Sequence, residues 1–247
     1  MRIAVIIPAR YASTRFPGKP LADIRGRSMI MHVWDRVRQA QGIEKVVVAT
    51  DDERIFRHVT ENGGEVVMTS PSHESGTSRC AEAARLISGQ GNFDAIINVQ
   101  GDEPFIDPKQ VEEVARLLGH QEVLIASLMK KIDTESELLS PHAVKVVTDA
   151  RGWALYFTRQ PVPAVRGMET NQWLSRMDYY KHMGIYGYKS FILQNLARLP
   201  IAPASQSESL EQLTWLHQGY KIRMGLTSYE SVAIDTPEDL LKVINIK

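Results

Sequence analysis

Length, composition and charge exclude several classes of protein. The chain has 247 residues, 43% of them hydrophobic, which is enough for a sizeable core in one large domain or two small ones. Its 29 basic and 29 acidic side chains balance, so net charge gives no general attraction to nucleic acid or to anionic membranes. No apolar run reaches the roughly 18 residues of a membrane span, and the N-terminus lacks a signal-peptide layout. With a single cysteine, Cys80, an internal disulfide framework is excluded, and we expect a cytoplasmic protein.

The N-terminal half alternates between short apolar runs and amphipathic stretches. Buried strands are expected at 3–8, 45–50, 65–68 and 95–99. Helices are expected at 28–41, from a cap at Asp51 or Asp52 to about Gly63, and from about Thr77 to Ser88. Strands separated by such helices predict βαβ units, and so an α/β fold with a mostly parallel, Rossmann-like sheet and helices on both faces.

The second half has a less regular pattern. Strands are expected at 123–128, 143–148, 153–157, 183–188 and 221–226, and the segment 160–179 is interpreted as a loop. Helices are expected at 191–198, 207–218 and 237–246, the last with Thr236 as its cap. We therefore expect one domain, residues 1–247, with a smaller mixed α/β subregion at roughly 122–190.

A cationic loop follows the first predicted strand. It contains Arg10, Arg15 and Lys19 among prolines, a glycine and hydroxyl residues. Ligands of open parallel sheets bind beyond the carboxyl ends of the strands, and this composition suits a polyphosphate. The spacing of a P-loop is absent. A solvated turn that is incidentally basic is the alternative, and composition alone favours neither.

Two acidic residues also follow apolar runs. Asp102 comes after the strand at 95–99, and Asp235 comes after the run at 232–234. Each suits a helix cap, but carboxylates beside phosphates are also the ligands that Mg²⁺ takes in nucleotide sites. Together with the cationic loop, the two acids indicate metal-assisted phosphoryl or nucleotidyl transfer.

Nine ordered motifs then resemble the sugar-acid cytidylyltransferases, specifically the Kdo (3-deoxy-manno-octulosonate) cytidylyltransferase family. They are IIPARYASTRFPGKPL at 6–21, ATDD at 49–52, SGT at 75–77, NVQGDEP at 98–104, VKVV at 144–147, ALYFTR at 154–159, HMGIYGY at 182–188, ESLEQL at 208–213 and DTPEDL at 235–240. Their order covers nearly the whole chain. The resemblance implies a nucleotidyltransferase that uses CTP, Kdo and Mg²⁺ in lipopolysaccharide biosynthesis, and a homodimer whose subregion serves sugar binding and dimerisation.

The resemblance also implies roles for single residues. Arg10, Arg15 and Lys19 fall at the triphosphate, and Asp102 and Asp235 fall on metal-ligand positions. Because charge grows on phosphate oxygens during transfer, Arg10, Lys19, Asp102 and Asp235 are expected to carry most of the catalysis. No protein base is evident.

The remaining aligned positions divide into two sets. The set near the cytosine is Ala9, Ser75 and Arg79, and the set in the sugar-acid pocket is Gln100, Arg159, His182, Tyr186, Glu211 and Gln212. Arg159 suits pairing with the sugar carboxylate. Simple packing of Tyr186, loop ordering by His182, and ordinary exposure of Glu211 and Gln212 on a helix flank are the alternatives.

Three positions depart from the family pattern. Ser78 and Ser205 replace acidic residues that are common in the family, and Ala233 replaces a glycine two positions before Asp235. None of them removes an expected phosphate or metal contact. They leave open the same chemistry on 8-amino-Kdo or another sugar acid, and a divergent, non-catalytic nucleotide-binding paralogue.

Overall fold

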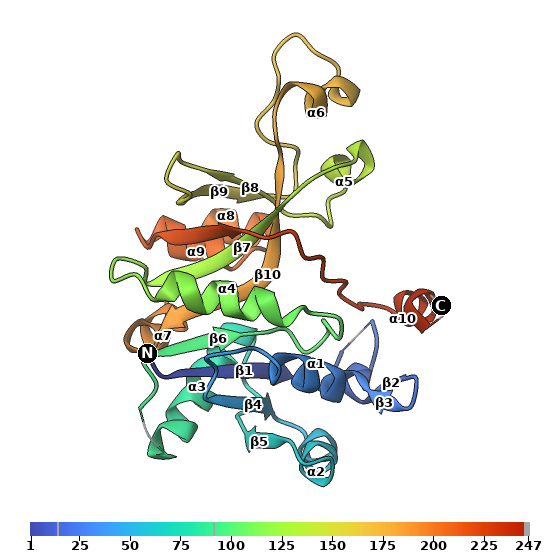
Figure 1. Ribbon diagram of the computed structural model, residues 1–247, viewed down its shortest axis with the longest axis vertical. Helices are drawn as coiled ribbons and strands as arrows, with labels where there is room; N and C mark the ends of the chain where they lie inside the picture. Colours follow the sequence, from blue (N-terminus) through green and yellow to red (C-terminus); the bar gives the residue numbers. More distant parts are fainter. Residues whose placement is uncertain (14, 91, 245–247) are drawn as a thin grey trace.

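One large sheet organises the part of the chain described by this computed structural model, which covers residues 1–13, 15–90 and 92–244. Seven strands lie side by side in the order β11-β7-β10-β6-β1-β4-β5, and β8 pairs with β10 and β9 (Figure 1). The strands are β1 (Ile3–Ala9), β4 (Lys45–Thr50), β5 (Glu65–Met68), β6 (Ala95–Asn98), β7 (Ile125–Lys131), β8 (Lys145–Thr148), β9 (Ala154–Thr158), β10 (Tyr180–Lys189) and β11 (Ile222–Leu226). A small hairpin of β2 (Asp23–Ile24) and β3 (Arg27–Ser28) stands apart.

The directions of the strands show at which edge of the sheet a ligand is expected to bind. β1 runs parallel to β4 and β6, β4 to β5, and β7 to β11, whereas β10 lies antiparallel between β6 and β7. The expectation of a mostly parallel sheet is therefore confirmed. The carboxyl ends of β1, β4 and β6 meet at the same edge, which is where open α/β sheets bind ligands.

Helices cover both faces of the sheet, as predicted. Along β1, Ile3, Val5 and Ile7 face one cluster of buried side chains, and Ala4 and Ile6 face another. The first cluster is covered by α1 (Met29–Val37), α2 (Glu53–Glu61) and α4 (Pro108–Leu118), and the second by α3 (Gly76–Ile87), α7 (Ser190–Leu196) and α9 (Gln212–His217).

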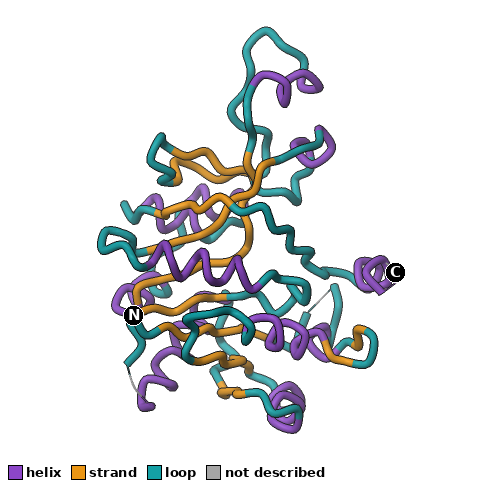
Figure 2. Tube along the Cα trace, in the orientation of Figure 1, coloured by secondary structure: helices purple, strands orange, loops and turns teal. Residues whose placement is uncertain are grey.

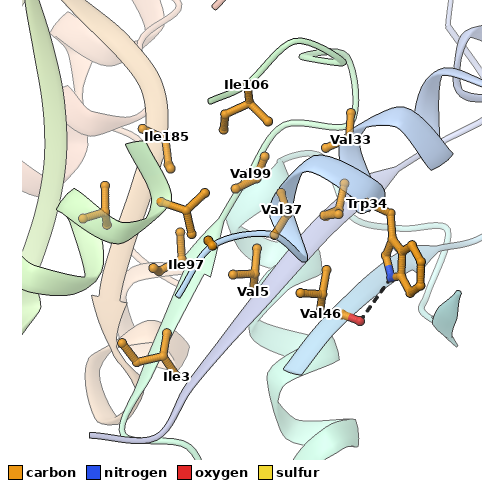
Figure 3. Close-up of a cluster of buried hydrophobic side chains, with 14 of the residues drawn as sticks. Ile3, Val5, Val33, Trp34, Val37, Val46, Ile97, Val99, Ile106 and Ile185 are labelled. Atoms are coloured by element: carbon orange, nitrogen blue, oxygen red, sulfur yellow. Dashed lines mark hydrogen bonds between the residues drawn. The ribbon is translucent and has the colours of Figure 1, made fainter. Parts of the chain in front are cut away.

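Part of the first cluster is shown in Figure 3, where Val37 of α1 lies over Val5 of β1, with Val33 and Ile97 in the same cluster. These side chains are fully buried. Burial of such branched side chains contributes about 1.5–3 kcal/mol each, so this packing fixes α1 against the sheet.

Two segments leave the main body of the sheet. Between β7 and β10 the chain forms a projection with α5 (Glu135–Leu139), β8, β9, η3 (Thr170–Gln172) and α6 (Trp173–Arg176), at the top of Figure 1. After β11, residues 227–236, here named the C-terminal strap, cross as a loop to α10 (Pro237–Ile244) (Figure 2). None of the helices in the described residues has the length and apolar character needed to span a bilayer.

Several expected elements differ from the structure. The prediction of one continuous helix at 207–218 is wrong. Ser209 takes a left-handed backbone conformation with a φ of 52° and separates α8 (Pro203–Glu208) from α9. The loop expected at 160–179 contains the short η3 and α6. Two further 3₁₀ turns are η1 (Lys19–Leu21) and η2 (Ser88–Gln90). The last two residues of the helix expected at 237–246 lie outside the described residues.

Candidate active site

Two acidic residues from distant parts of the sequence meet at one ammonium group. Nζ of Lys19 lies 2.6 Å from Oδ2 of Asp102 and 3.3 Å from Oδ1 of Asp235. Nη2 of Arg15 lies 3.2 Å from the same Asp235 oxygen. The Lys19 side chain is 14% exposed, whereas those of Asp102 and Asp235 are 28% and 42% exposed. The structure thus brings both acids to the basic loop, as expected from the sequence.

A turn at Gly18 folds the basic loop back over the end of β1. Gly18 has a φ of 73°, which favours glycine, and its N–H donates to the carbonyl of Tyr11 at 3.0 Å. A Cβ at this position would lie 3.1 Å from the Tyr11 ring. The Arg54 guanidinium stacks over the Tyr11 ring, with its central carbon 3.3 Å from the ring centroid. The turn delivers Lys19, the first residue of η1, to the edge of the sheet.

The loop after β6 is joined both to β1 and to the C-terminal strap. A Cβ on Gly101 would lie 2.8 Å from the carbonyl oxygen of Pro8, so glycine permits this close approach. The N–H of Ile234 donates to the carbonyl of Asp102 at 2.9 Å, and the Ile234 side chain is fully buried. These contacts fix the backbone beside each of the two acids.

A cleft of about 230 Å³ lies at this edge of the sheet. It is lined by every residue predicted to bind the nucleotide or the metal, and by Gln100 of the predicted sugar-acid set. These residues are Ala9, Arg10, Arg15, Lys19, Ser75, Arg79, Gln100, Asp102 and Asp235. Ser13, His73 and Glu74 also line the cleft and were not anticipated. The Ser-rich sequence TSPSHESGT at 69–77 was an available signal for the last two, because it precedes a predicted helix.

The N-terminus of α3 connects the cleft to Glu211. Ser75 is the N-cap of α3, and its Oγ accepts from the N–H of Ser78 at 3.1 Å. The same hydroxyl donates to Oε1 of Glu211 at 2.9 Å, and Thr77 Oγ1 donates to Oε2 at 2.7 Å. Burial raises the pKa of Glu211, and the two hydroxyl donors oppose that rise. The alternative of ordinary exposure on a helix flank is therefore wrong for Glu211, which is only partly exposed and accepts two hydrogen bonds just before α9.

Two arginines predicted to contact substrate are already bound by protein groups. Arg79 is buried, with Nη1 donating to Oγ1 of Thr69 at 2.7 Å and Nη2 lying 3.2 Å from Oδ2 of Asp51. Nε of Arg159 donates to the carbonyl of Glu208 at 2.8 Å. Among the described residues, Arg159 is not one of those that line the cleft. Pairing of Arg159 with a sugar carboxylate stays a prediction.

His182 and Tyr186 lie in an aromatic layer on β10. The His182 ring centroid lies 5.2 Å from that of Phe157 and 5.0 Å from that of Tyr186. Nε2 of His182 lies 2.9 Å from Oγ of Ser127, and burial lowers the pKa of His182 to about 3, so the imidazole is neutral. Among the described atoms, the buried Tyr186 hydroxyl has no hydrogen-bond partner. Gln212 is buried at the start of α9.

A second cavity, of about 600 Å³, adjoins the cleft because His73, Glu74 and Ser75 line both. Glu211 lines it too. So do two of the three residues that depart from the family pattern, which are Ser78 and Ser205. Oγ of Ser78 accepts from the Ser75 N–H at 3.4 Å and completes the capping box of α3, so the local fold at this position is retained.

Another carboxyl group directly follows Asp102. Glu103 is 7% exposed, and burial raises its pKa to about 8. The negative charge of Asp102 adds to the rise, and the Ser231 hydroxyl opposes it. The sequence pattern included Glu103 only as a member of the motif at 98–104 and gave it no role.

The donor set around Lys19 fits a magnesium ion shared with a nucleotide. Mg²⁺ in nucleotide sites takes one or two carboxylates and completes its shell with phosphate oxygens and water. Asp102 and Asp235 offer two partly exposed carboxylates on either side of one cation. The described residues contain no group of three or more His, Cys, Asp or Glu side chains that could hold a metal without such a ligand.

Comparisons with known proteins agree with this geometry. The sequence profile described as "Cytidylyltransferase" matches residues 4–222. The 3-deoxy-manno-octulosonate cytidylyltransferase of Cytophaga hutchinsonii is 49% identical over 98% of this chain and 96% of its own, and that of Parabacteroides distasonis is 46% identical over 99% and 97%. The chain belongs to the 3-deoxy-manno-octulosonate cytidylyltransferase family.

A solved structure of this family has the same fold. It is a CMP:2-keto-3-deoxy-manno-octonic acid synthetase complexed with CTP, 40% identical, with a TM-score of 0.90 over 99% of this chain and 97% of its own. A more distant cytidylyltransferase from Leptospira borgpetersenii, 19% identical with a TM-score of 0.61, shares the fold alone. The expected α/β nucleotidyltransferase fold is therefore confirmed for this Kdo cytidylyltransferase family member.

Proposed function

We propose that this protein transfers the cytidylyl group of CTP to Kdo and releases pyrophosphate. The oxygen of the sugar C2 hydroxyl bonds to the α-phosphorus, while the bond from that phosphorus to the oxygen bridging to the β-phosphate breaks. Pyrophosphate leaves with the electron pair, and the hydroxyl proton passes to solvent. The observation that carries this proposal is the meeting of Lys19, Asp102 and Asp235 in a cleft that Arg10 and Arg15 also line.

The cations of the basic loop would bind the triphosphate. Arg10, Arg15 and Lys19 offer charge-assisted donors at the end of β1, where negative charge grows on the leaving pyrophosphate. Without nucleotide, Lys19 pairs with both acids and Arg15 with Asp235. Nucleotide phosphates would take over these cations and leave both carboxylates free to hold a cation of their own.

Asp102 and Asp235 are the residues that would hold Mg²⁺. When bound, this ion supplies Lewis-acid polarisation of phosphoryl oxygens and neutralises charge in the transition state. The protein residues orient the reactants around it. Ser75 and Gly76, at the N-terminus of α3, line the nucleotide side of the cleft, and Gln100 lines the same cleft after β6.

The sugar acid is proposed to lie beside the aromatic layer of β10. The buried Tyr186 hydroxyl, which has no partner among the described residues, supports this placement, because buried polar groups normally find a partner and a sugar hydroxyl would supply one. Gln100 lies close to β10, because a Cβ on Gly184 would be 3.9 Å from its Cγ, and the charge of Glu211, just before α9, acts on Tyr186. A neutral His182 then offers an uncharged surface to the sugar ring.

We also propose a cytoplasmic homodimer that supplies CMP-Kdo for lipopolysaccharide biosynthesis. The exposed apolar side chains of Leu139, Leu155, Tyr156 and Met177 on the projection support self-association. Light scattering coupled to size exclusion tests the oligomeric state. A monomer at micromolar concentration would overturn this part of the proposal.

Pyrophosphate release tests the reaction directly. The protein is mixed with CTP, Mg²⁺ and, in separate samples, Kdo, 8-amino-Kdo and other sugar acids. Turnover with Kdo supports the proposal, whereas turnover with 8-amino-Kdo alone would assign the same chemistry to the modified sugar. Thermal stabilisation by CTP without any turnover would instead identify a nucleotide-binding paralogue that has lost catalysis.

A further inference from the structure

The junction between α8 and α9 carries two glutamates that bind different elements of the fold. Glu208 is the last residue of α8, Ser209 forms the left-handed turn, and Glu211 lies just before α9. Leu210 and Glu211 line the second cavity together with Ser209. The described residues that line this cavity and the cleft do not include Glu208. Any effect of Glu208 on a bound substrate must therefore pass through its neighbours.

The Glu208 carboxylate binds the end of β9. Its Oε1 accepts from the Thr158 hydroxyl at 2.6 Å, and its Oε2 accepts from the N–H of Arg159 at 2.9 Å. The pairing of β9 with β8 ends at the buried Thr158, so the carboxylate takes the first backbone N–H beyond the paired residues. Hydrogen bonds to an ionised acceptor are about twice as strong as neutral ones. Both oxygens of Glu208 thus hold the end of α8 against the end of β9.

Arg159 makes a return contact to the backbone of the junction. Its Nε donates to the carbonyl of Glu208 at 2.8 Å, and its Nη1 donates to the carbonyl of Pro141 at 2.9 Å. Glu208 and Arg159 are therefore joined twice, by the carboxylate with the N–H and by the guanidinium with the carbonyl. Arg159→Ala would remove the guanidinium bonds and leave both carboxylate bonds of Glu208 in place.

On its other side the junction is held at α3. Leu210 is 6% exposed and packs in the second cluster of buried side chains. The next residue, Glu211, accepts from the hydroxyls of Ser75 and Thr77 at the N-terminus of α3. A short turn is all that separates the anchor at β9 from the anchor at α3. The position of Glu208 therefore limits where the Glu211 carboxylate can reach.

We propose that Glu208 is a positioning residue, which holds the α8–α9 junction against β9 so that Glu211 stays at the N-terminus of α3. The inference rests on the proposed function, because Glu211 belongs to the predicted sugar-acid set and Ser75, which it binds, to the predicted cytosine set. Glu208 itself touches neither substrate. It acts on CTP through Glu211, and on the sugar acid through both Glu211 and Arg159.

Glu208→Ala removes both carboxylate bonds, and Glu208→Gln is the conservative variant. A glutamine keeps an oxygen that accepts from the Arg159 N–H, and its amide donates to the Thr158 oxygen in place of the bond that is lost. Thr158→Val removes one of the two bonds and keeps the proposal testable where Glu208→Ala fails to fold. Glu61→Ala is the matched control, since Glu61 is the exposed last residue of α2, as Glu208 is the last residue of α8. Glu208→Ala is also combined with Glu211→Ala.

Three measurements are made on each variant that circular dichroism shows to be folded. Hydrogen exchange of the Arg159 amide is followed without ligands and reports the bond to the Glu208 carboxylate directly. Calorimetry with CTP and Mg²⁺ gives the Kd of the nucleotide. Steady-state pyrophosphate release gives kcat and the KM of the sugar acid.

We expect the Arg159 amide to exchange about tenfold faster in Glu208→Ala and about fivefold faster in Thr158→Val, on the scale of lost hydrogen bonds. In Glu208→Ala the Kd of CTP should rise about fivefold and the KM of the sugar acid about tenfold, with kcat within about twofold. Glu208→Gln should stay within about threefold of the unmodified protein in each quantity, and Glu61→Ala within about twofold.

The double variant separates positioning from a general loss of stability. If Glu208 acts on CTP through Glu211, adding Glu208→Ala to Glu211→Ala changes the Kd of CTP by less than about twofold. Independent effects would multiply, to roughly fiftyfold above the unmodified protein when Glu211→Ala alone costs about tenfold.

Three results would overturn the inference. They are unchanged exchange of the Arg159 amide in Glu208→Ala, or in Thr158→Val where the first variant does not fold; a multiplied Kd in the double variant; and a Glu208→Gln variant as impaired as Glu208→Ala. If the unmodified protein binds CTP but releases no pyrophosphate with any sugar acid, the proposed function fails instead. The amide exchange and the Kd of CTP then still decide whether Glu208 positions Glu211.

Discussion

Ser75 and Glu211 are 136 residues apart in the chain, yet their side chains share a 2.9 Å hydrogen bond. Ser75 belongs to the residues predicted to lie near the cytosine, and Glu211 to those predicted to bind the sugar acid. The same Ser75 hydroxyl caps α3, so the N-terminus of α3 and the start of α9 are linked through one oxygen atom. The two predicted halves of the site are therefore structurally connected.

Substitution of Glu211 should affect both substrates. In Glu211→Ala the buried hydroxyl of Thr77 and the half-buried hydroxyl of Ser75 lose their acceptor, and the loss costs about 1–3 kcal/mol for the buried one. We expect the free energy of unfolding to fall by about 2 kcal/mol and the KM values for CTP and for the sugar acid both to rise about tenfold. Urea unfolding and steady-state kinetics measure these changes. A rise in the KM of the sugar acid alone would show that the link to Ser75 has no role in nucleotide binding.

Asp102→Asn should abolish turnover while it leaves the fold intact. The side chain is partly exposed, so its loss of charge has little effect on packing, but the site would retain one carboxylate where two are proposed to hold Mg²⁺. We expect kcat to fall at least about a hundredfold, the scale of losing one transition-state electrostatic contact. Asp35→Asn is the control, since it removes the same charge from a partly exposed ion pair with Arg27, and Asp35 is not among the described residues that line the cleft. A rate for Asp102→Asn equal to that of the control would refute the metal role.

The sequence was sufficient for the core of the fold because its strands are short, apolar and separated by capped helices. Asp52 does cap α2, and the strands expected at 45–50 and 65–68 have the predicted bounds. The helix α4 was missed, although Asp107 and Gln110 form a capping box and Pro108 follows the cap. Its apolar positions, spaced three and four apart, were the available signal.

Other features depend on contacts between distant segments and have no local signature. The antiparallel placement of β10 between β6 and β7 is a choice of strand pairing, which periodicity does not encode. The contact of Lys19 with both acids needs the strap to cross the sheet edge. Local pattern also gave no indication that main-chain carbonyls bind the Arg159 guanidinium, since those carbonyls come from segments distant in the sequence.

Arg159→Ala should weaken binding of the sugar acid more than binding of CTP. The guanidinium donates to the carbonyls of Glu208, at the end of α8, and of Pro141, so its removal also loosens two segments beside the predicted sugar pocket. We expect the KM of the sugar acid to rise about tenfold or more, with a change of less than threefold for CTP, on the scale of one charge-assisted contact. Arg151→Ala, at an exposed arginine, is the control. A selective loss of CTP affinity would reverse the assignment of Arg159 to the sugar pocket.

His182 should make the folded state sensitive to mild acid. Burial lowers its pKa from 6.5 to about 3, so between these values the unfolded chain binds a proton that the folded protein does not, and stability falls as pH falls. From pH 7 to pH 5 this one group should reduce the free energy of unfolding by roughly 2 kcal/mol. Urea unfolding at both pH values tests this, with His182→Gln expected to reduce the pH dependence by that amount. Phe157→Leu, which loses the ring contact but keeps the imidazole, should lower stability at both pH values and keep the slope. An unchanged slope in His182→Gln would show that another group causes the acid sensitivity.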